Sequence, residues 1–229
     1  MGVIYDTSNV LLKGALGIFG DWKVEGKENV PPKGPLIIVS NHQSNMDPPI
    51  LAISIPRRIN FMAKRGLFHN PVASSFFKAY GAFPLNQSGN DLAAIQRSLK
   101  ILSRDGALVI FPEGTRSPGA MRKAIPGIAM IALRSGAPIL PVGITGTEVI
   151  APPWQVAIPK GQFRVRIGQP FSVPSTEGAV VRGQLKATTT MIMELVAALL
   201  PASYRGVYAR RASEVASEVA KRENGNGGT

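Results

Sequence analysis

Residues 41–47, N-H-Q-S-N-M-D, hold the side chains of this chain that are best suited to proton transfer. His42 is one of only two histidines, the other being His69, and Asp47 follows it by five residues. On a continuous helix, residues five apart point about 140° away from each other, so the pair can meet only if His42 lies in a turn before the helix. Asp47 followed by two prolines is typical of such a helix start, with Asp47 as N-cap. The carboxylate would then fix the imidazole tautomer and leave the other ring nitrogen free to take a proton.

The same residues also allow a simpler interpretation, in which a capping aspartate lies beside a solvent-facing histidine. No residue of the chain lies in a sequence context typical of a catalytic nucleophile. Cysteine is absent, no G-x-S-x-G elbow occurs, and Ser44 lacks the strand-to-helix turn that presents a reactive serine. If His42 is a base, its simplest use is therefore to activate a hydroxyl of the substrate. Two histidines and scattered carboxylates predict no metal site.

A second polar cluster, F-P-E-G-T-R-S-P-G, occupies residues 111–119. Arg116 offers a planar fork suited to a phosphate group, and Thr115 and Ser117 add hydroxyls. Gly114 permits a turn in which backbone N–H groups can face an anion. An ordinary loop with a solvated arginine remains the alternative. Neither a Walker A nor a G-x-G-x-x-G pattern occurs, which disfavours a nucleotide-binding fold and predicts no cofactor.

The positive charge of the chain is concentrated in its middle. The net charge is +12, and residues 31–176 carry sixteen basic and five acidic side chains. Such a segment attracts nucleic acid, anionic lipid or phosphorylated substrates, although a generally basic surface would give the same count. Only 7% of residues are aromatic and no basic and aromatic residues interleave, so we expect no nucleic acid partner.

Strand-length apolar runs alternate with helical patterns, which predicts an α/β fold with a mostly parallel mixed sheet covered by helices. Polar clusters follow four of the strands, and ligands bind beyond the carboxyl ends of parallel strands, so we expect these clusters to converge. The alternation in F-R-V-R-I-G indicates an edge strand at 163–168. The expected strands are 35–40, 59–64, 81–85, 107–112, 137–144 and 163–168, and the expected helices are 48–55, 71–80, 91–104, 126–136 and 187–200.

An amphipathic helix is expected near the N-terminus, over residues 7–20. Helical spacing places Leu11, Leu12, Ala15, Ile18 and Phe19 on one side. That side could lie on a membrane surface or pack on the core, and amphipathicity alone does not separate the two. No signal peptide is apparent, and no stretch of about 18 apolar residues predicts a spanning helix.

These patterns divide the chain into three parts. Residues 1–30 form a membrane-associating helix and a lead-in strand, residues 31–203 the main domain, and residues 204–229 a polar C-terminal helix and a disordered tail.

Together, N-H-Q-S-N-M-D and F-P-E-G-T-R-S make the chain resemble the glycerolipid acyltransferase family, typified by 1-acyl-sn-glycerol-3-phosphate acyltransferase. That family carries an N-H-x-x-x-x-D block and, some sixty to eighty residues later, an F-P-E-G-T-R-S block, and both are present here without a mismatch. F-M-A-K-R-G-L-F (61–68) is similar to its lysine-bearing segment, and A-P-I-L-P-V-G-I to its later proline-containing strand. The similarity extends over about residues 30–150.

The resemblance implies transfer of a fatty acyl group from acyl-CoA or acyl-carrier protein to the sn-2 hydroxyl of 1-acyl-glycerol-3-phosphate, giving phosphatidic acid. By position, His42 would be the general base and Asp47 its orienter. The acceptor's phosphate would be bound by Glu113, Gly114, Thr115 and Arg116, with Lys64 assisting. The hydroxyl would attack the thioester directly, which agrees with the missing nucleophile.

A lysophospholipid acceptor also implies a membrane surface as partner, with peripheral or monotopic attachment at the cytoplasmic face. Alternatives that keep the fold are another lysolipid or glycerol 3-phosphate as acceptor, or a lipid-binding module without turnover. One position departs from the family. Its second block usually ends in arginine, and here that place is taken by the neutral Gln87. Lys64, Arg116 or the pair Arg122 and Lys123 would then have to compensate, or the acceptor would differ.

Overall fold

The structure is a computed structural model that describes residues 2–86, 91–150, 153–176 and 178–210. Its centre is a seven-stranded sheet in the order β1-β7-β6-β2-β5-β3-β4. Five neighbouring strands, β6, β2, β5, β3 and β4, run parallel, whereas β7 is antiparallel to β6 and β1 is parallel to β7. The strands are β1 (Gly20–Glu25), β2 (Leu36–Ser40), β3 (Ile59–Lys64), β4 (Ala82–Leu85), β5 (Ala107–Ile110), β6 (Ile139–Thr145) and β7 (Gly161–Ile167).

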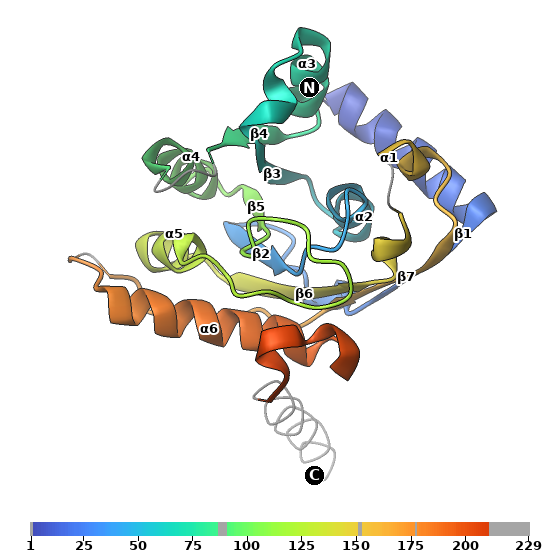
Figure 1. Ribbon diagram of the computed structural model, residues 1–229. Helices are drawn as coiled ribbons and strands as arrows, with labels where there is room; N and C mark the ends of the chain where they lie inside the picture. The colour runs from blue at the N-terminus through green and yellow to red at the C-terminus, as the bar shows by residue number, and fades with distance from the viewer. Residues whose placement is uncertain (1, 87–90, 151–152, 177, 211–229) are drawn as a thin grey trace, which may run out of the picture.

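Helices cover both faces of this sheet (Figure 1). On the central strand β2, Ile38 belongs to a core with α1 and α2, whereas Ile37 and Val39 belong to a core with α4, α5 and α6. Successive side chains of the strand therefore pack into two separate cores, one on each face of the sheet. This is why the run L-I-I-V-S is apolar at four successive positions. The helices are α1 (Gly2–Phe19), α2 (Asp47–Ser54), α3 (Pro71–Ala79), α4 (Leu92–Leu102), α5 (Gly127–Ser135) and α6 (Arg182–Ala198). The predicted α/β class with a mostly parallel, helix-covered sheet is confirmed.

The N-terminal helix α1 packs on the core and also exposes an apolar side. Tyr5, Leu12 and Leu16 are buried, whereas Leu11 and Ile18 are 68% and 76% exposed. The expectation that Leu11 and Leu12 share one side was wrong, because consecutive helical residues diverge by about 100°. In the described residues, no helix combines the length and apolar character needed to cross a bilayer.

Two local predictions need correction. The segment F-R-V-R-I-G is not an edge strand, because β7 lies between β1 and β6. It alternates because one of its faces is solvated, with Phe163 and Val165 buried and Arg166 exposed on the other side. Asp47 is not the N-cap of α2 either. That position belongs to Met46, and Asp47 begins the helix while its carboxylate bonds to the preceding turn.

Candidate active site

The loops after β2, β5 and β6 meet at one edge of the sheet, because these three strands are parallel neighbours. The backbone N–H of His42 donates to Glu113 Oε1 at 2.9 Å, and the N–H of Ser117 donates to the carbonyl of His42 at 2.7 Å. The two polar clusters of the sequence, 41–47 and 113–117, are thus hydrogen-bonded to each other. Lys64 ends β3 at the same edge and is exposed, with no hydrogen bond to either cluster in the described residues.

His42 and Asp47 form the pair that their spacing allowed. His42 Nδ1 lies 2.7 Å from Asp47 Oδ2, and the side-chain exposures are 18% for His42 and 0% for Asp47. Because a carboxylate only accepts hydrogen bonds, Nδ1 must carry the proton of the neutral ring. Nε2 has no hydrogen-bond partner in the described residues, so its lone pair is available to a substrate. This arrangement suits general base catalysis.

The Asp47 carboxylate is held by donors on every side. Oδ2 also accepts the backbone N–H groups of Gln43 and Ser44, and Oδ1 accepts the hydroxyl of Thr147. Thr147, which is fully buried in the turn after β6, escaped the sequence analysis. A signal was present, since T-G-T follows a predicted strand in the same way as the other polar clusters do. Asp47 therefore ties the β6 loop to the β2 loop.

Two further contacts hold the His42 ring and its loop in place. Phe111, which the sequence analysis did not select, stacks on the imidazole with ring centroids 4.3 Å apart. Asn41 pairs with the backbone of Ile144 through two hydrogen bonds of 2.8 Å, as if it extended the β2–β6 ladder. The ring orientation is thus set by packing as well as by Asp47, as a preorganised base requires.

Glu113 braces two loops rather than facing solvent. It is 5% exposed, and its two oxygens accept the backbone N–H groups of His42 and Arg122, the second at 2.8 Å. Burial raises the pKa of Glu113, and the N–H groups of Arg122 and His42 oppose that shift. Because both oxygens are engaged by the backbone, this side chain supports the site without offering a face to an anion.

The remaining residues of this cluster differ in exposure. Ser117 is buried and its hydroxyl donates to the carbonyl of Ala120, so it does not face a ligand. Gly114 has φ 69°, and a β-carbon there would lie 2.6 Å from Ile125 Cδ1, so only glycine fits this turn. Thr115 and Arg116 are exposed. Their exposure fits contact with a soluble or membrane-borne ligand. Gln87, the position that departs from the family's arginine, lies outside the described residues.

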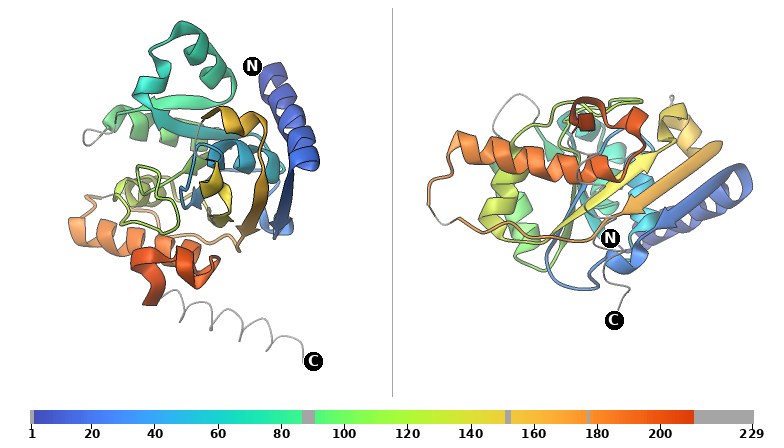
Figure 2. Two further views of the ribbon diagram at one scale, coloured as in Figure 1. Left: turned by 45° about the vertical axis from the view of Figure 1, so that its right-hand side comes forward. Right: turned by 90° about the horizontal axis from the view of Figure 1, so that it is seen from below.

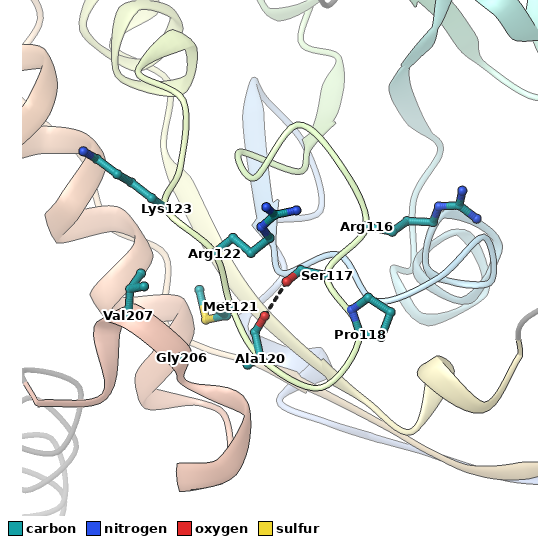
Figure 3. Close-up of a pocket in the computed structure, with 9 residues that line it drawn as sticks. All are labelled: Arg116, Ser117, Pro118, Ala120, Met121, Arg122, Lys123, Gly206 and Val207. Carbon is teal, nitrogen blue, oxygen red and sulfur yellow. Dashed lines mark hydrogen bonds between the residues drawn. The ribbon is translucent and has the colours of Figure 1, made fainter.

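An open hollow of about 560 Å³ lies beside this loop (Figure 3). Its lining is basic at three positions and otherwise mostly small or apolar: Arg116, Ser117, Pro118, Ala120, Met121, Arg122, Lys123, Gly206 and Val207. The C-terminal segment, residues 201–208, closes one wall. Met121 N–H donates to the carbonyl of Tyr204 at 2.9 Å, and Ala124 N–H donates to the hydroxyl of Tyr208 at 3.0 Å.

This C-terminal segment also reaches the β6 loop that holds Asp47. The hydroxyl of Tyr204 donates to Glu148, the residue after Thr147. Burial and the contact with Glu148 raise the pKa of Tyr204 to about 12, so the hydroxyl stays protonated as a donor at neutral pH. The C-terminal segment 201–208 therefore contacts both the loop at residues 121–124 and Glu148, which follows Thr147. Within the described ranges, no group of three acidic, histidine or cysteine side chains could hold a metal ion.

Comparison with known proteins assigns the family. The Acyltransferase family profile matches residues 21–145. The 1-acyl-sn-glycerol-3-phosphate acyltransferase of Bacillus subtilis (strain 168) is 31% identical over 164 residues, which cover 70% of this chain and 78% of the relative. The Saccharomyces cerevisiae protein of the same name is 32% identical over 168 residues, covering 71% of this chain and 54% of the relative, so the chain spans about half of that protein.

A solved structure agrees with this assignment. The crystal structure of the 1-acyl-sn-glycerophosphate (LPA) acyltransferase, PlsC, from Thermotoga maritima superposes with a TM-score of 0.66 at 25% identity, covering 94% of this chain and 80% of that one. The predicted family is thereby confirmed. The chain belongs to the acyltransferase family and is an O-acyltransferase. Its relatives include 1-acyl-sn-glycerol-3-phosphate acyltransferases.

Proposed function

We propose that this protein moves a fatty acyl group from the thioester of acyl-CoA or acyl-carrier protein to the sn-2 hydroxyl of 1-acyl-glycerol-3-phosphate, giving phosphatidic acid. The observation that carries the proposal is the His42–Asp47 pair. Its buried carboxylate fixes the proton on Nδ1 and leaves Nε2 free, at the edge of the sheet where parallel strands bind ligands. A lipid-binding module without turnover would have no use for a base oriented in this way.

The reaction can proceed by direct transfer. Nε2 of His42 takes the proton of the acceptor hydroxyl as the oxygen attacks the thioester carbonyl carbon. The resulting imidazolium is stabilised by Asp47. The tetrahedral intermediate then expels the thiolate by breaking the C–S bond, and the thiolate takes the proton back from His42. No acyl-enzyme is needed, in keeping with a chain without cysteine.

The acceptor's phosphate is assigned to the exposed turn at residues 114–116. Arg116 supplies a bidentate fork and Thr115 a hydroxyl, while Gly114 allows the turn itself. Lys64, at the end of β3 on the same sheet edge, adds a point charge. Glu113 acts indirectly in this scheme, by holding the backbone of His42 and Arg122.

Membrane attachment is assigned to the outer side of α1. Its exposed apolar side chains supply insertion into the interface, and the excess of basic residues over 31–176 supplies attraction to anionic lipid. We therefore propose peripheral or monotopic binding at the cytoplasmic face, where a lysolipid acceptor can be taken directly from the bilayer.

Replacing His42 by alanine should lower kcat by about 10²- to 10⁴-fold, which is the usual contribution of a positioned base. His69→Ala is the matched control, because His69 is the second histidine and is exposed beyond the site. The measurement is thiol release from acyl-CoA or acyl-carrier protein in the presence of a panel of lysolipids, with the products identified by mass. Full activity of the His42→Ala protein would remove His42 as the base.

Thr147→Val should act through Asp47, without touching substrate. A lost hydrogen bond to a charged group is worth about 1.5–3 kcal/mol, so kcat should fall by about 10- to 150-fold. Thr147→Ser retains the hydroxyl and should recover most of the activity. If Thr147→Ser were as inactive as Thr147→Val, or if both retained the activity of the unaltered protein, the hydrogen bond to Asp47 would have no role in positioning.

Arg116→Ala should mainly raise the KM for the phosphorylated acceptor, by about 10- to 150-fold, because it removes one charge-assisted contact. Lys100→Ala removes an exposed cation on α4 and should leave that KM unchanged. Steady-state kinetics with 1-acyl-glycerol-3-phosphate as the varied substrate checks both variants. An unaltered KM for Arg116→Ala would assign the phosphate to other cations.

Leu11→Ala and Leu16→Ala are a matched pair on α1. Leu16 is 1% exposed, so its truncation should cost about 2–5 kcal/mol of the free energy of unfolding. Leu11 is exposed, so its truncation should leave the midpoint of unfolding unchanged. It should lower the fraction of protein that sediments with anionic vesicles. Vesicle binding that is unaffected by Leu11→Ala would argue against α1 as the membrane contact.

A further inference from the structure

Within the part of the chain that the structure describes, the three cations around the hollow form no ion pair. Arg116, Arg122 and Lys123 are exposed, and the ion pairs of the described residues involve other arginines and His42. Two acidic side chains of the neighbouring loops bond elsewhere, Glu113 to two backbone N–H groups and Glu148 to Tyr204, and neither lines the hollow. The lining of the hollow thus carries three basic and no acidic side chains, which favours an anionic ligand.

The size of the hollow exceeds what a single phosphate needs. About 560 Å³ is within the range of sites that bind cofactor-sized ligands. Val207, which is 68% exposed, adds apolar surface, and Figure 3 shows Arg116 and Lys123 extending in opposite directions with Arg122 between them. A ligand that fits this lining is long, partly apolar and anionic at more than one point.

The hollow lies on the opposite layer from the proposed membrane contact. Met121 and Tyr208 belong to the core formed with α5 and α6, whereas α1 belongs to the core on the other face of the sheet. Figures 1 and 2 show the C-terminal segment on the far side of the sheet from α1. A ligand dissolved in water can therefore reach the rim of the hollow at Arg122 and Lys123 without passing α1.

The hollow is also connected to the catalytic loop. Glu113 Oε2 accepts the N–H of Arg122 and Oε1 accepts the N–H of His42. One carboxylate therefore bridges the backbone that lines the hollow and the backbone that carries His42. Direct transfer requires the donor's thioester and the acceptor's hydroxyl at His42 at the same time. One substrate must therefore approach from a side that the lipid does not occupy.

We propose that this hollow binds the phosphate-bearing pantetheine carrier of the thioester donor. Arg122 and Lys123 contact its phosphates, the exposed Val207 contacts the pantetheine arm, and Arg116 at the opposite rim serves the acceptor. The proposal rests on the proposed function, since it takes the donor to be a thioester. Coenzyme A and the prosthetic group of a carrier protein share this chemistry, and the experiment below separates them.

The test measures binding of free coenzyme A and of holo-acyl-carrier protein, each by calorimetry, without turnover. The double variant Arg122→Ala/Lys123→Ala keeps both backbone N–H groups and should bind the true carrier about tenfold or more weakly, as expected for the loss of one or two charge-assisted hydrogen bonds. Lys186→Ala, an exposed lysine on α6, should bind as the unaltered protein does. Thermal unfolding of all three proteins checks that they are folded.

The outcomes are distinct. Weaker binding of coenzyme A, or of the carrier protein, supports the site and names the source of the phosphate. Kinetics should then show a raised KM for that donor with the KM for the lysolipid unchanged. Binding of both carriers at full strength by the double variant would overturn the site. A protein that binds coenzyme A through Arg122 and Lys123 but transfers no acyl group would instead refute the proposed function and leave the binding site standing.

Discussion

The buried carboxylate of Asp47 is the constraint on which the site depends. An uncompensated ion at a fully buried position would cost several kcal/mol, so it persists only if donors surround it. Here the donors are the His42 ring, two backbone N–H groups of the turn and the hydroxyl of Thr147. These groups come from the β2 loop and from the β6 loop, about a hundred residues apart in the chain. The hydrogen bonds that compensate the buried charge of Asp47 therefore include the one that orients His42, the proposed base.

Glu113 extends this logic to the β5 loop. Its carboxylate is also buried, and both of its oxygens accept hydrogen bonds from backbone N–H groups. Together the two acids fasten the loops of three adjacent parallel strands to one another. Because the parallel sheet brings those strand ends together, the same topology that forms the core also gathers the reactive groups. Little rearrangement of the loops is then needed for His42 to act as the proposed base.

How much of this the sequence could predict depends on whether the information is local. The strands were predictable because runs such as L-I-I-V-S are buried on both faces, and the convergence of polar clusters followed from parallel pairing. The contact between His42 and Asp47 was foreseen as possible, but the N-cap role of Asp47 was wrong. Whether a carboxylate caps its own helix or binds the turn before it depends on backbone geometry that the spacing does not specify.

Long-range partners were the part that could not be predicted. Thr147 and Phe111 contact Asp47 and His42 only because of how the β5 and β6 loops return to the site. Both lie in polar or motif-bearing loops after expected strands, but their local sequence does not say which side chain each one contacts. The position of β7 inside the sheet was missed for the same reason. Its alternation reports one solvated face, and which strands flank it is decided by pairing with β1 and β6.

The two faces of the sheet give a physical reason for the layout of the molecule. The proposed direct acyl transfer joins a lipid from the bilayer to a carrier dissolved in water, so the proposed base must be reachable from both phases. The exposed apolar side of α1 belongs to one layer and the basic hollow beside the C-terminal segment to the other, while His42 lies at the strand edge between them. A side chain at that edge can meet both substrates without either one crossing the core. The β2 loop is therefore a better place for the base than either face of the sheet, where a helix would cover one approach.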